Sequence, residues 1–210
     1  MTAWLTRIVL EPRSKTAQRD LRDAEALHKR VMSLVPDGLG EQARAKAGVL
    51  YRYDETGAVG PHLLVQSGLP IDAARLPQQY GSLAVRDLTL LLDLLHSDLA
   101  VRYRIVGNTT KRLGRTSERA GKLLALRGAE ADQWWHARAE ANGLILRTLT
   151  STPLPDVRGK GPGAVRHAAT RFDGLAVVKD PDLVRQAVLN GIGRGKAYGC
   201  GLLSLAPLVT

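Results

Sequence analysis

The sequence Leu99-Ala-Val-Arg-Tyr-Arg-Ile105 carries the clearest structural signal in this chain of 210 residues. Apolar side chains alternate in it with Arg102 and Arg104, so one face of an extended strand is apolar and the other is basic. This period of two is typical of a strand that covers a core with one face and meets solvent with the other. We therefore expect a half-buried strand at 99–105 with a cationic outer surface.

The elements on either side of this strand predict the same order twice. Before it we expect a strand at 4–10, one amphipathic helix at 16–35, a hairpin of 48–53 with 61–67, a brief helix near 71–76 and a strand near 83–91. After it we expect a helix at 129–142, strands at 144–150 and 164–178, a helix from Pro181 that Asp180 caps and that stops near Asn190, and a strand at 202–205.

Each half thus has the order β-α-β-β-α-β, which is the ferredoxin-like unit. The predicted fold class is α+β, with two tandem ferredoxin-like (RRM-like) domains at 1–92 and 93–210. The segments 107–128 and 151–163 are rich in Gly, Pro, Thr and basic residues. They predict long insertions in the second domain, either functional or mobile loops.

The composition predicts a globular protein with a polyanionic partner. Lys and Arg number 30 against 20 Asp and Glu, the net charge is +10, and 44% of residues are apolar. One cysteine, Cys200, excludes an internal disulfide, a cysteine-based zinc finger and a CxxC redox centre. The sequence has no apolar run long enough for a membrane span and no secretion signal at its start, so we expect a cytoplasmic protein with no membrane contact.

The positive charge is concentrated in the second half. Residues 93–210 hold 18 basic and 10 acidic side chains, whereas residues 1–92 hold 12 and 10. Such clusters are either a solvated face or a surface for a phosphate backbone, and two clusters almost without acids favour the phosphate surface. The first cluster consists of Arg102, Arg104, Lys111, Arg112, Arg115, Arg119, Lys122 and Arg127. The second consists of Arg158, Lys160, Arg166 and Arg171, with His167 beside them.

A third feature is the glycine cluster at 191–201, with five glycines in eleven residues. A nucleotide-binding loop would follow a strand and precede a helix, but here the predicted helix comes first and no Ser or Thr follows Lys196. Two interpretations stay open. The bare backbone either approaches a nucleic acid or another chain closely, aided by the charges of Arg194 and Lys196, or it forms a kinked connection between helix and strand.

The ending Gly191-Ile-Gly-Arg-Gly-Lys-Ala-Tyr-Gly-Cys-Gly-Leu-Leu-Ser-Leu-Ala-Pro-Leu208 resembles the C-terminal glycine-rich loop and last strand of the CasE family. These are the CRISPR endoribonucleases of type I-E systems. A first strand from Trp4, a helix with Leu27-His28-Lys29 and the strand His62–Ser67 extend the resemblance over nearly the full chain. It implies a tandem ferredoxin-like fold, metal-independent cleavage of a CRISPR repeat stem-loop in precursor crRNA, and assembly with the protein subunits of Cascade.

The resemblance also implies the site residues. His28 would be the catalytic histidine and Lys29 its basic neighbour, with the substrate's own 2′-hydroxyl as the nucleophile. A lone histidine on the apolar side of a helix is otherwise more often a packed residue, but an imidazole does exchange protons near neutral pH. Some family members have a tyrosine where this chain has Glu25, which either raises the pKa of His28 or faces solvent. His28 is thus an acid, a base or both, and Arg166 is expected to contact RNA.

Other residues point to no further site. The remaining histidines have no metal-ligand spacing with one another or with Cys200, so neither a metal nor another cofactor is expected. Trp134 and Trp135 are expected in the core or at its boundary, and Tyr103 inside. Three functions stay open: an endoribonuclease that keeps its product, a non-catalytic stem-loop-binding subunit, and a basic scaffold for any nucleic acid or acidic partner.

Overall fold

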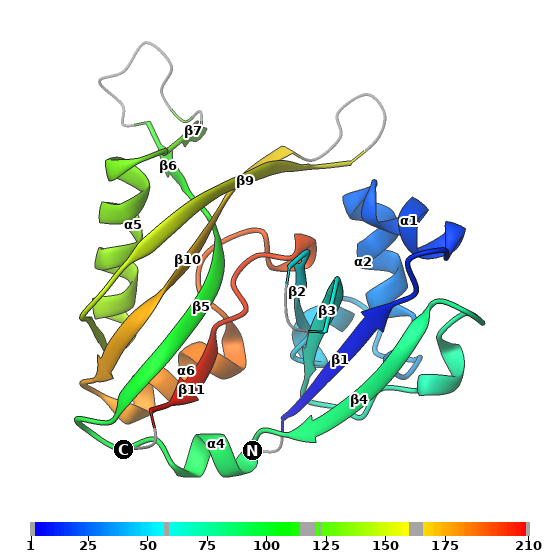
Figure 1. The fold of residues 1–210 in the computed structure, drawn as a ribbon, viewed down its shortest axis with the longest axis horizontal. Helices are drawn as coiled ribbons and strands as arrows, with labels where there is room; N and C mark the ends of the chain where they lie inside the picture. The colour runs from blue at the N-terminus through cyan, green and yellow to red at the C-terminus, as the bar shows by residue number, and fades with distance from the viewer. Residues whose placement is uncertain (1–2, 57–58, 114–120, 122, 160–165, 209–210) are drawn as a thin grey trace.

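The computed structural model describes residues 3–56, 59–113, 121, 123–159 and 166–208. Two antiparallel sheets and a small hairpin carry the chain, with helices between the strands (Figure 1). The first half contains β1 (Trp4–Leu10), α1 (Lys15–Leu21), α2 (Ala24–Met32), α3 (Ala43–Lys46), β2 (Leu50–Asp54), β3 (His62–Ser67), the 3-10 turn η1 (Ala73–Arg75), β4 (Gly81–Asp87) and α4 (Thr89–Asp93). The second contains β5 (Ala100–Asn108), β6 (Thr110–Arg112), β7 (Leu123–Ala125), α5 (Ala129–Ala141), β8 (Leu144–Leu146), β9 (Thr150–Arg158), β10 (Arg166–Val178), α6 (Pro181–Asn190), the 3-10 turn η2 (Lys196–Tyr198) and β11 (Ser204–Pro207).

The first sheet has the strand order β2-β3-β1-β4, and all neighbours are antiparallel. This is the ferredoxin-like order, as the sequence predicted. Helix α2 covers one face of the sheet, since Leu27 and Val31 share a buried cluster with Ile8 of β1 and Leu63 of β3. The predicted hairpin is confirmed by the pairing of β2 with β3.

The second sheet repeats that order as β11-β5-β10-β8. Strand β5 confirms the alternation read from the sequence, because Val101, Tyr103 and Ile105 are at most 1% exposed whereas Arg102 is exposed. Helices α5 and α6 pack on the apolar face, with Trp135 fully buried among the core residues. The expectations for Tyr103 and the two tryptophans are therefore confirmed.

The single helix expected at 16–35 is wrong, because the chain forms two helices there. Helix α1 ends at Leu21, and Asp23 caps α2 by accepting a hydrogen bond from the backbone N–H of Glu25 at 3.0 Å. An aspartate that binds a nearby backbone donor competes with helix continuation. The amphipathic spacing continued across the break and concealed it. The strand expected at 83–91 is also shorter, since the residues after Asp87 turn into α4.

The two expected loop insertions contain more structure than predicted. Residues 150–158 form β9, which pairs antiparallel with β10, and β6 pairs with β7 inside the segment 107–128. Pro153 and Pro155 made the segment 151–163 resemble a loop, but β9 is an edge strand, and an edge strand tolerates proline because one side of its backbone needs no partner. The helix α6 follows the prediction, with Asp180 as its N-cap and Pro181 in its first turn.

Buried hydrogen bonds tie the two sheets together, and α4 joins them along the bottom of Figure 1. Arg52 of β2, 2% exposed, donates to Leu202 O and Ser204 Oγ of the second half at 3.3 and 3.0 Å. Gln66 of β3 donates to Val188 O of α6 at 2.8 Å. No helix in the described part of the chain is long and apolar enough to cross a membrane.

Candidate active site

His28 lies on α2 against the 3-10 turn of the glycine-rich loop. Its ring centroid is 6.0 Å from that of Tyr198. The ring is half-buried, and Nδ1 is buried without a hydrogen-bond partner among the described residues. A buried polar atom without a partner costs free energy, so such an atom calls for an explanation, and a role in proton transfer is one. His28 is therefore the first candidate for proton chemistry.

The surroundings of His28 favour the neutral ring. Burial lowers its pKa below the ordinary 6.5, the positive charge of Arg44 lowers it further, and the backbone carbonyl of Ala197 acts in the opposite direction. The sequence left open whether Glu25 raises this pKa. The pKa is lowered instead, which suits a base that accepts a proton at neutral pH.

Two more cations belong to the same site. Burial lowers the pKa of Lys196 on η2, and the charge of Arg44 lowers it again. Arg44 of α3 donates from Nη1 to Val49 O at 3.0 Å, which holds the guanidinium near both residues. Like charges held together disfavour one another unless an anion joins them. The cluster of His28, Arg44 and Lys196 thus has the chemistry of a phosphate site.

The glycine-rich loop, residues 191–201, shapes this cluster by lying close to the strands. Tyr51 of β2, buried, donates from its hydroxyl to Ala197 O at 2.9 Å, the carbonyl that acts on His28. Gly201 has φ +89°, and a Cβ there would lie 2.8 Å from the carbonyl oxygen of Ile192. The contacts observed are those of a kinked connection between helix and strand, the second of the two interpretations, and a close approach to a nucleic acid stays a prediction.

A second histidine reaches the same turn from the other sheet. His167 on β10 has its ring 5.4 Å from that of Tyr198, and its Nδ1 lies 2.8 Å from Asn108 Nδ2 of β5. Burial lowers the pKa of His167 below its ordinary value. Tyr198 therefore stands in contact with an imidazole from each half of the molecule.

The predicted basic residues divide into three groups. Lys29, Arg102, Arg158 and Arg194 are exposed, and Lys29 points away from the buried face of α2. Others carry internal contacts: Arg104 pairs with Asp173 and, at 3.9 Å, with Asp54, Lys111 with Glu130 at 3.6 Å, and Arg112 donates to Gly121 O at 2.9 Å. The third group lies outside the described residues, namely Arg115, Arg119, Lys122, Lys160 and the side chain of Arg166.

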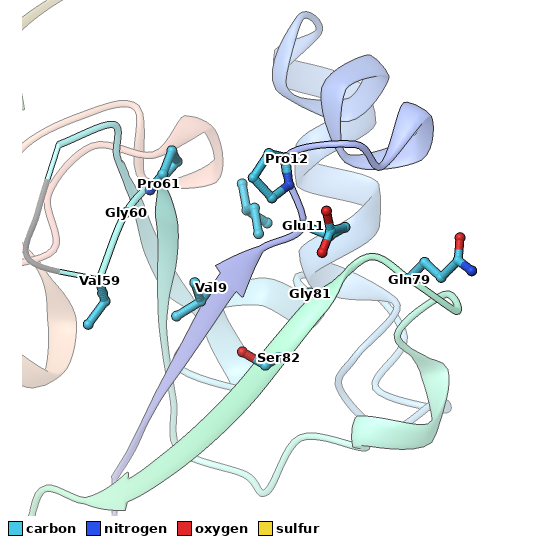
Figure 2. Close-up of a pocket in the computed structure, with 10 residues that line it drawn as sticks. Val9, Glu11, Pro12, Val59, Gly60, Pro61, Gln79, Gly81 and Ser82 are labelled. Atoms are coloured by element: carbon cyan, nitrogen blue, oxygen red, sulfur yellow. The ribbon is translucent and has the colours of Figure 1, made fainter.

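A cavity of about 680 Å³ lies beside this site. Its walls come from the start of α2, the end of β2 and the strands β9 and β10, and Tyr198 and Arg158 line it. A second cavity of about 530 Å³ lies at the end of β1, beside the segment with Gly60 and Pro61 (Figure 2). Among its described lining residues only Glu11 is ionisable, so it lacks the charge that a phosphate needs.

Neither a metal centre nor a reactive thiol emerges from the described residues. No group of three His, Cys, Asp or Glu side chains in that part of the chain is arranged to hold a metal ion. Burial raises the pKa of Cys200 to about 12, so the thiol stays protonated and inert.

Of the residues in this candidate site, the sequence predicted functions for His28 and Lys196 but not for three others. Arg44 lies on a helix of four residues, Asn108 ends the strand that carries Arg102 and Arg104, and Tyr198 lies in the glycine-rich loop. The amino-acid types alone gave no signal, because the site forms only when both sheets are in place.

The two sheets of ferredoxin-like order define an α+β protein, and a histidine on a helix of the first half lies beside the glycine-rich loop of the second. A family model described as "CRISPR associated protein" matches residues 3–207. The CRISPR-associated endoribonuclease Cse3 of Thermus thermophilus is 32% identical over 220 residues, which cover 97% of this chain and 100% of that protein.

Solved structures agree with this comparison. Thermus thermophilus Cse3 bound to an RNA representing a pre-cleavage complex has 30% identity and a TM-score of 0.83, covering 99% of this chain and 100% of the other. A chain of a CRISPR RNA-guided surveillance complex, pre-nicking, has 44% identity and a TM-score of 0.74, covering 98% and 100%. This chain therefore belongs to the CRISPR associated protein family, in its CasE group.

Proposed function

We propose that this protein is a metal-independent endoribonuclease that recognises the CRISPR repeat stem-loop and cleaves precursor crRNA. The observation that carries the proposal is the half-buried His28 with lowered pKa beside Arg44 and Lys196. A neutral imidazole and two cations are what an attack by the substrate's 2′-hydroxyl on the adjacent phosphorus needs. The relatives support it, since one is named an endoribonuclease and its structure holds a pre-cleavage RNA.

In the proposed step, His28 takes the proton of the 2′-hydroxyl as the oxygen attacks phosphorus. Arg44 and Lys196 stabilise the negative charge that develops on the phosphorane-like transition state. One well-placed donor of this kind is worth about 2.7–4 kcal/mol. Lys29, exposed on the next position of α2, contributes charge at the edge of the site rather than inside it.

The proposal divides the work between two domains, residues 1–92 and residues 93–210. The first supplies His28 and the second supplies the glycine-rich loop and the cationic surface that holds the stem. The RNA contacts proposed from the sequence are Arg102, Arg104, Lys111, Arg112, Arg115, Arg119, Lys122, Arg158, Lys160, Arg166, Arg194 and Lys196. Of these, Arg104 has the weakest case, because its charge is already paired with Asp173 and Asp54.

We also infer that the protein acts in the cytoplasm and keeps the cleaved RNA within Cascade. A relative in a surveillance complex supports the assembly. Recognition by phosphates and duplex shape supports retention, because a product that keeps its stem keeps most of those contacts.

The test is incubation of the purified protein in excess EDTA with an end-labelled repeat hairpin. We expect one cut that leaves a 2′,3′-cyclic phosphate, and no cut when the nucleotide before the scissile bond is 2′-deoxy. Tight binding without a cut would favour a non-catalytic subunit. Cleavage that EDTA abolishes, or cleavage of the deoxy substrate, would contradict the mechanism.

A further inference from the structure

The contact of His167 with Tyr198 places a second imidazole beside the proposed site. His28 and His167 lie at 6.0 and 5.4 Å from the same tyrosine ring, and they come from α2 and β10, in opposite halves of the chain. The function proposed above uses only His28. His167 is half-buried.

The balance of protons in the cleavage requires a second group. As the O2′–P bond forms, the 2′-hydroxyl proton passes to a base, and as the P–O5′ bond breaks, its electron pair stays on O5′, which must gain a proton. In an in-line displacement the attacking and leaving oxygens lie on opposite sides of phosphorus. One imidazole therefore cannot serve both oxygens at once, and a donor must reach the phosphate from the far side of His28.

Asn108 fixes the orientation of His167. The Asn108 side chain is buried at 2% exposure, and its Nδ2 lies 2.8 Å from Nδ1 of the histidine. Its Oδ1 is buried without a partner in the described part of the chain. A half-turn of the carboxamide exchanges the two atoms, so Asn108 either donates to Nδ1 of a neutral ring that carries its hydrogen on Nε2 or accepts from Nδ1 of a protonated ring. In the protonated ring Nε2 also carries a hydrogen and faces away from Asn108. Once that hydrogen leaves, the neutral ring keeps its other hydrogen on Nδ1, and Asn108 Oδ1 still accepts from it.

We propose that His167 is the general acid of the cleavage, transferring its Nε2 proton to the leaving 5′-oxygen, with Asn108 as its positioning residue. This inference rests on the proposed function. The step yields a 2′,3′-cyclic phosphate, a free 5′-hydroxyl, a protonated His28 and a neutral His167, and the two rings then exchange protons with water. Burial favours the neutral form of His167 in the free protein, whereas an adjacent phosphate anion favours the charged form.

Two other donors stand close enough to compete for this role. The Tyr198 ring contacts both imidazoles, and Lys196 begins the same turn. The experiment must therefore separate loss of a proton donor from loss of packing or charge. A substrate with sulfur in place of the bridging 5′-oxygen does so, because a thiolate leaves without a proton.

The experiment measures single-turnover cleavage in EDTA for wild type, His167→Ala, His167→Gln, Asn108→Ala and Tyr198→Phe, with His136→Ala on the exposed face of α5 as the matched control. We expect His167→Ala to cut the ordinary hairpin about 10²–10⁴-fold more slowly. On the 5′-thio hairpin it should cut at nearly the wild-type rate. Asn108→Ala should lose less of the cleavage rate on the ordinary hairpin, and the 5′-thio hairpin should restore that rate too. His136→Ala should cut both hairpins at the wild-type rate. Stem-loop affinity should stay within a few-fold throughout.

A His167→Ala protein that cuts like wild type, or that is equally slow on both substrates, would overturn the inference while leaving the proposed function intact. The inference would also be overturned if the 5′-thio hairpin restored the cleavage rate of Tyr198→Phe but not that of the His167 variants. If wild type binds and never cuts, the proposed function fails and the inference with it. His167→Gln keeps the side chain's volume and an amide donor, so it reports on proton transfer if the alanine variant unfolds.

Discussion

At the scale of single residues, the proposed site holds positive charges close together, and no ion pair to Arg44 or Lys196 is seen among the described residues. Arg44 acts on both His28 and Lys196 and lowers the pKa of each. Such an arrangement destabilises the free protein slightly but leaves a positive potential where the phosphate of the substrate would lie. A strained ground state of this kind is expected at a functional site.

Replacing Arg44 with Ala tests this coupling. Removing the cation lets the pKa of His28 rise, so the ring is protonated at a higher pH and the acidic limb of the cleavage rate moves to higher pH. We also expect a slower rate at every pH, by about 100–1,000-fold, since one transition-state donor is lost. A rate profile from about pH 5 to 8, the range in which an imidazole titrates, is measured in single turnover.

The matched control for that variant is Arg86→Ala, which removes one exposed charge from β4. It should leave the pH profile unchanged. An Arg44→Ala profile that coincides with wild type would show that Arg44 is not part of the site.

At this scale the sequence predicted His28 through a family resemblance and could not predict its neighbours. Arg44 reaches the site from a helix of four residues, and His167 and Asn108 meet only because β5 pairs with β10. Spacing along the chain carries no record of contacts that far apart in sequence. Lys29 is adjacent to His28 in sequence, but its side chain is exposed, so its role in the reaction stays a prediction.

At the scale of elements, the glycine-rich loop combines left-handed backbone with close packing. A Cβ added at Gly201 would lie 2.8 Å from the carbonyl oxygen of Ile192. A Cβ added at Gly38, which has φ +81°, would have no atom within 4 Å. Gly38→Ala should therefore lower the free energy of unfolding by about 1–2 kcal/mol, because alanine is strained in the left-handed backbone conformation but meets no neighbouring atom. Gly201→Ala should cost roughly 3 kcal/mol or more, because strain and overlap add. Denaturant unfolding of both variants measures this, and equal losses would contradict the packing argument.

The strand β9 ends in a cationic tip that we propose contacts RNA. Arg158 has a side chain 64% exposed and 3.6 Å from Asp156. Arg158→Ala should weaken stem-loop binding and lower the slope of log affinity against log salt by about 1. Binding isotherms at several salt concentrations measure the slope. If Arg158→Ala and Arg86→Ala leave the same slope, the stem does not reach this strand.

The elements themselves were predicted unevenly. Helix α6 was predicted well because an aspartate cap and a proline mark its start. The break between α1 and α2 and the strand β9 were missed, because hydrophobic spacing ran through the first and two prolines interrupted the second. Local signals locate an element's ends only when no tertiary pairing overrides them.

At the scale of the whole molecule, Arg52 joins the two sheets by hydrogen bonds to the second half, while Asp54 of the same strand balances its buried charge. The side chains of Arg52 and Asp54 are 3% and 4% exposed and 2.9 Å apart, and Arg52 also bonds to the backbone before β11. The same β2 strand carries Tyr51, which holds the Ala197 carbonyl. The geometry around His28 therefore depends on how the sheets are joined.

Arg52→Ala should lower the free energy of unfolding by about 3 kcal/mol, the lower end of the range for a broken buried pair, since the buried Asp54 loses its partner at 2.9 Å and keeps only Arg104 at 3.9 Å and His62 at 3.7 Å. Arg75→Ala is the matched control, because its partner Asp37 is exposed, and it should leave the unfolding free energy nearly unchanged. Denaturant unfolding of both proteins measures the difference. Equal stability of the two variants would mean that the buried contacts of Arg52 do not stabilise the fold.

The overall order of strands was predictable because the same β-α-β-β-α-β order occurs twice, and the observed sheet orders follow from it. The packing of one half on the other was not predictable. It depends on the hydrogen bonds of Arg52 and Gln66 to backbone carbonyls of the second half, and hydrophobic periodicity does not predict such contacts.

The measurement that tests the central claim most directly compares His28→Ala with wild type on the repeat hairpin, as single-turnover cleavage and as binding affinity. His136→Ala serves again as the exposed-histidine control. We predict that His28→Ala loses detectable cleavage while its affinity stays within a few-fold and His136→Ala cuts normally. A His28→Ala protein that still cuts the hairpin at a rate near wild type would remove His28 from the mechanism and contradict the account.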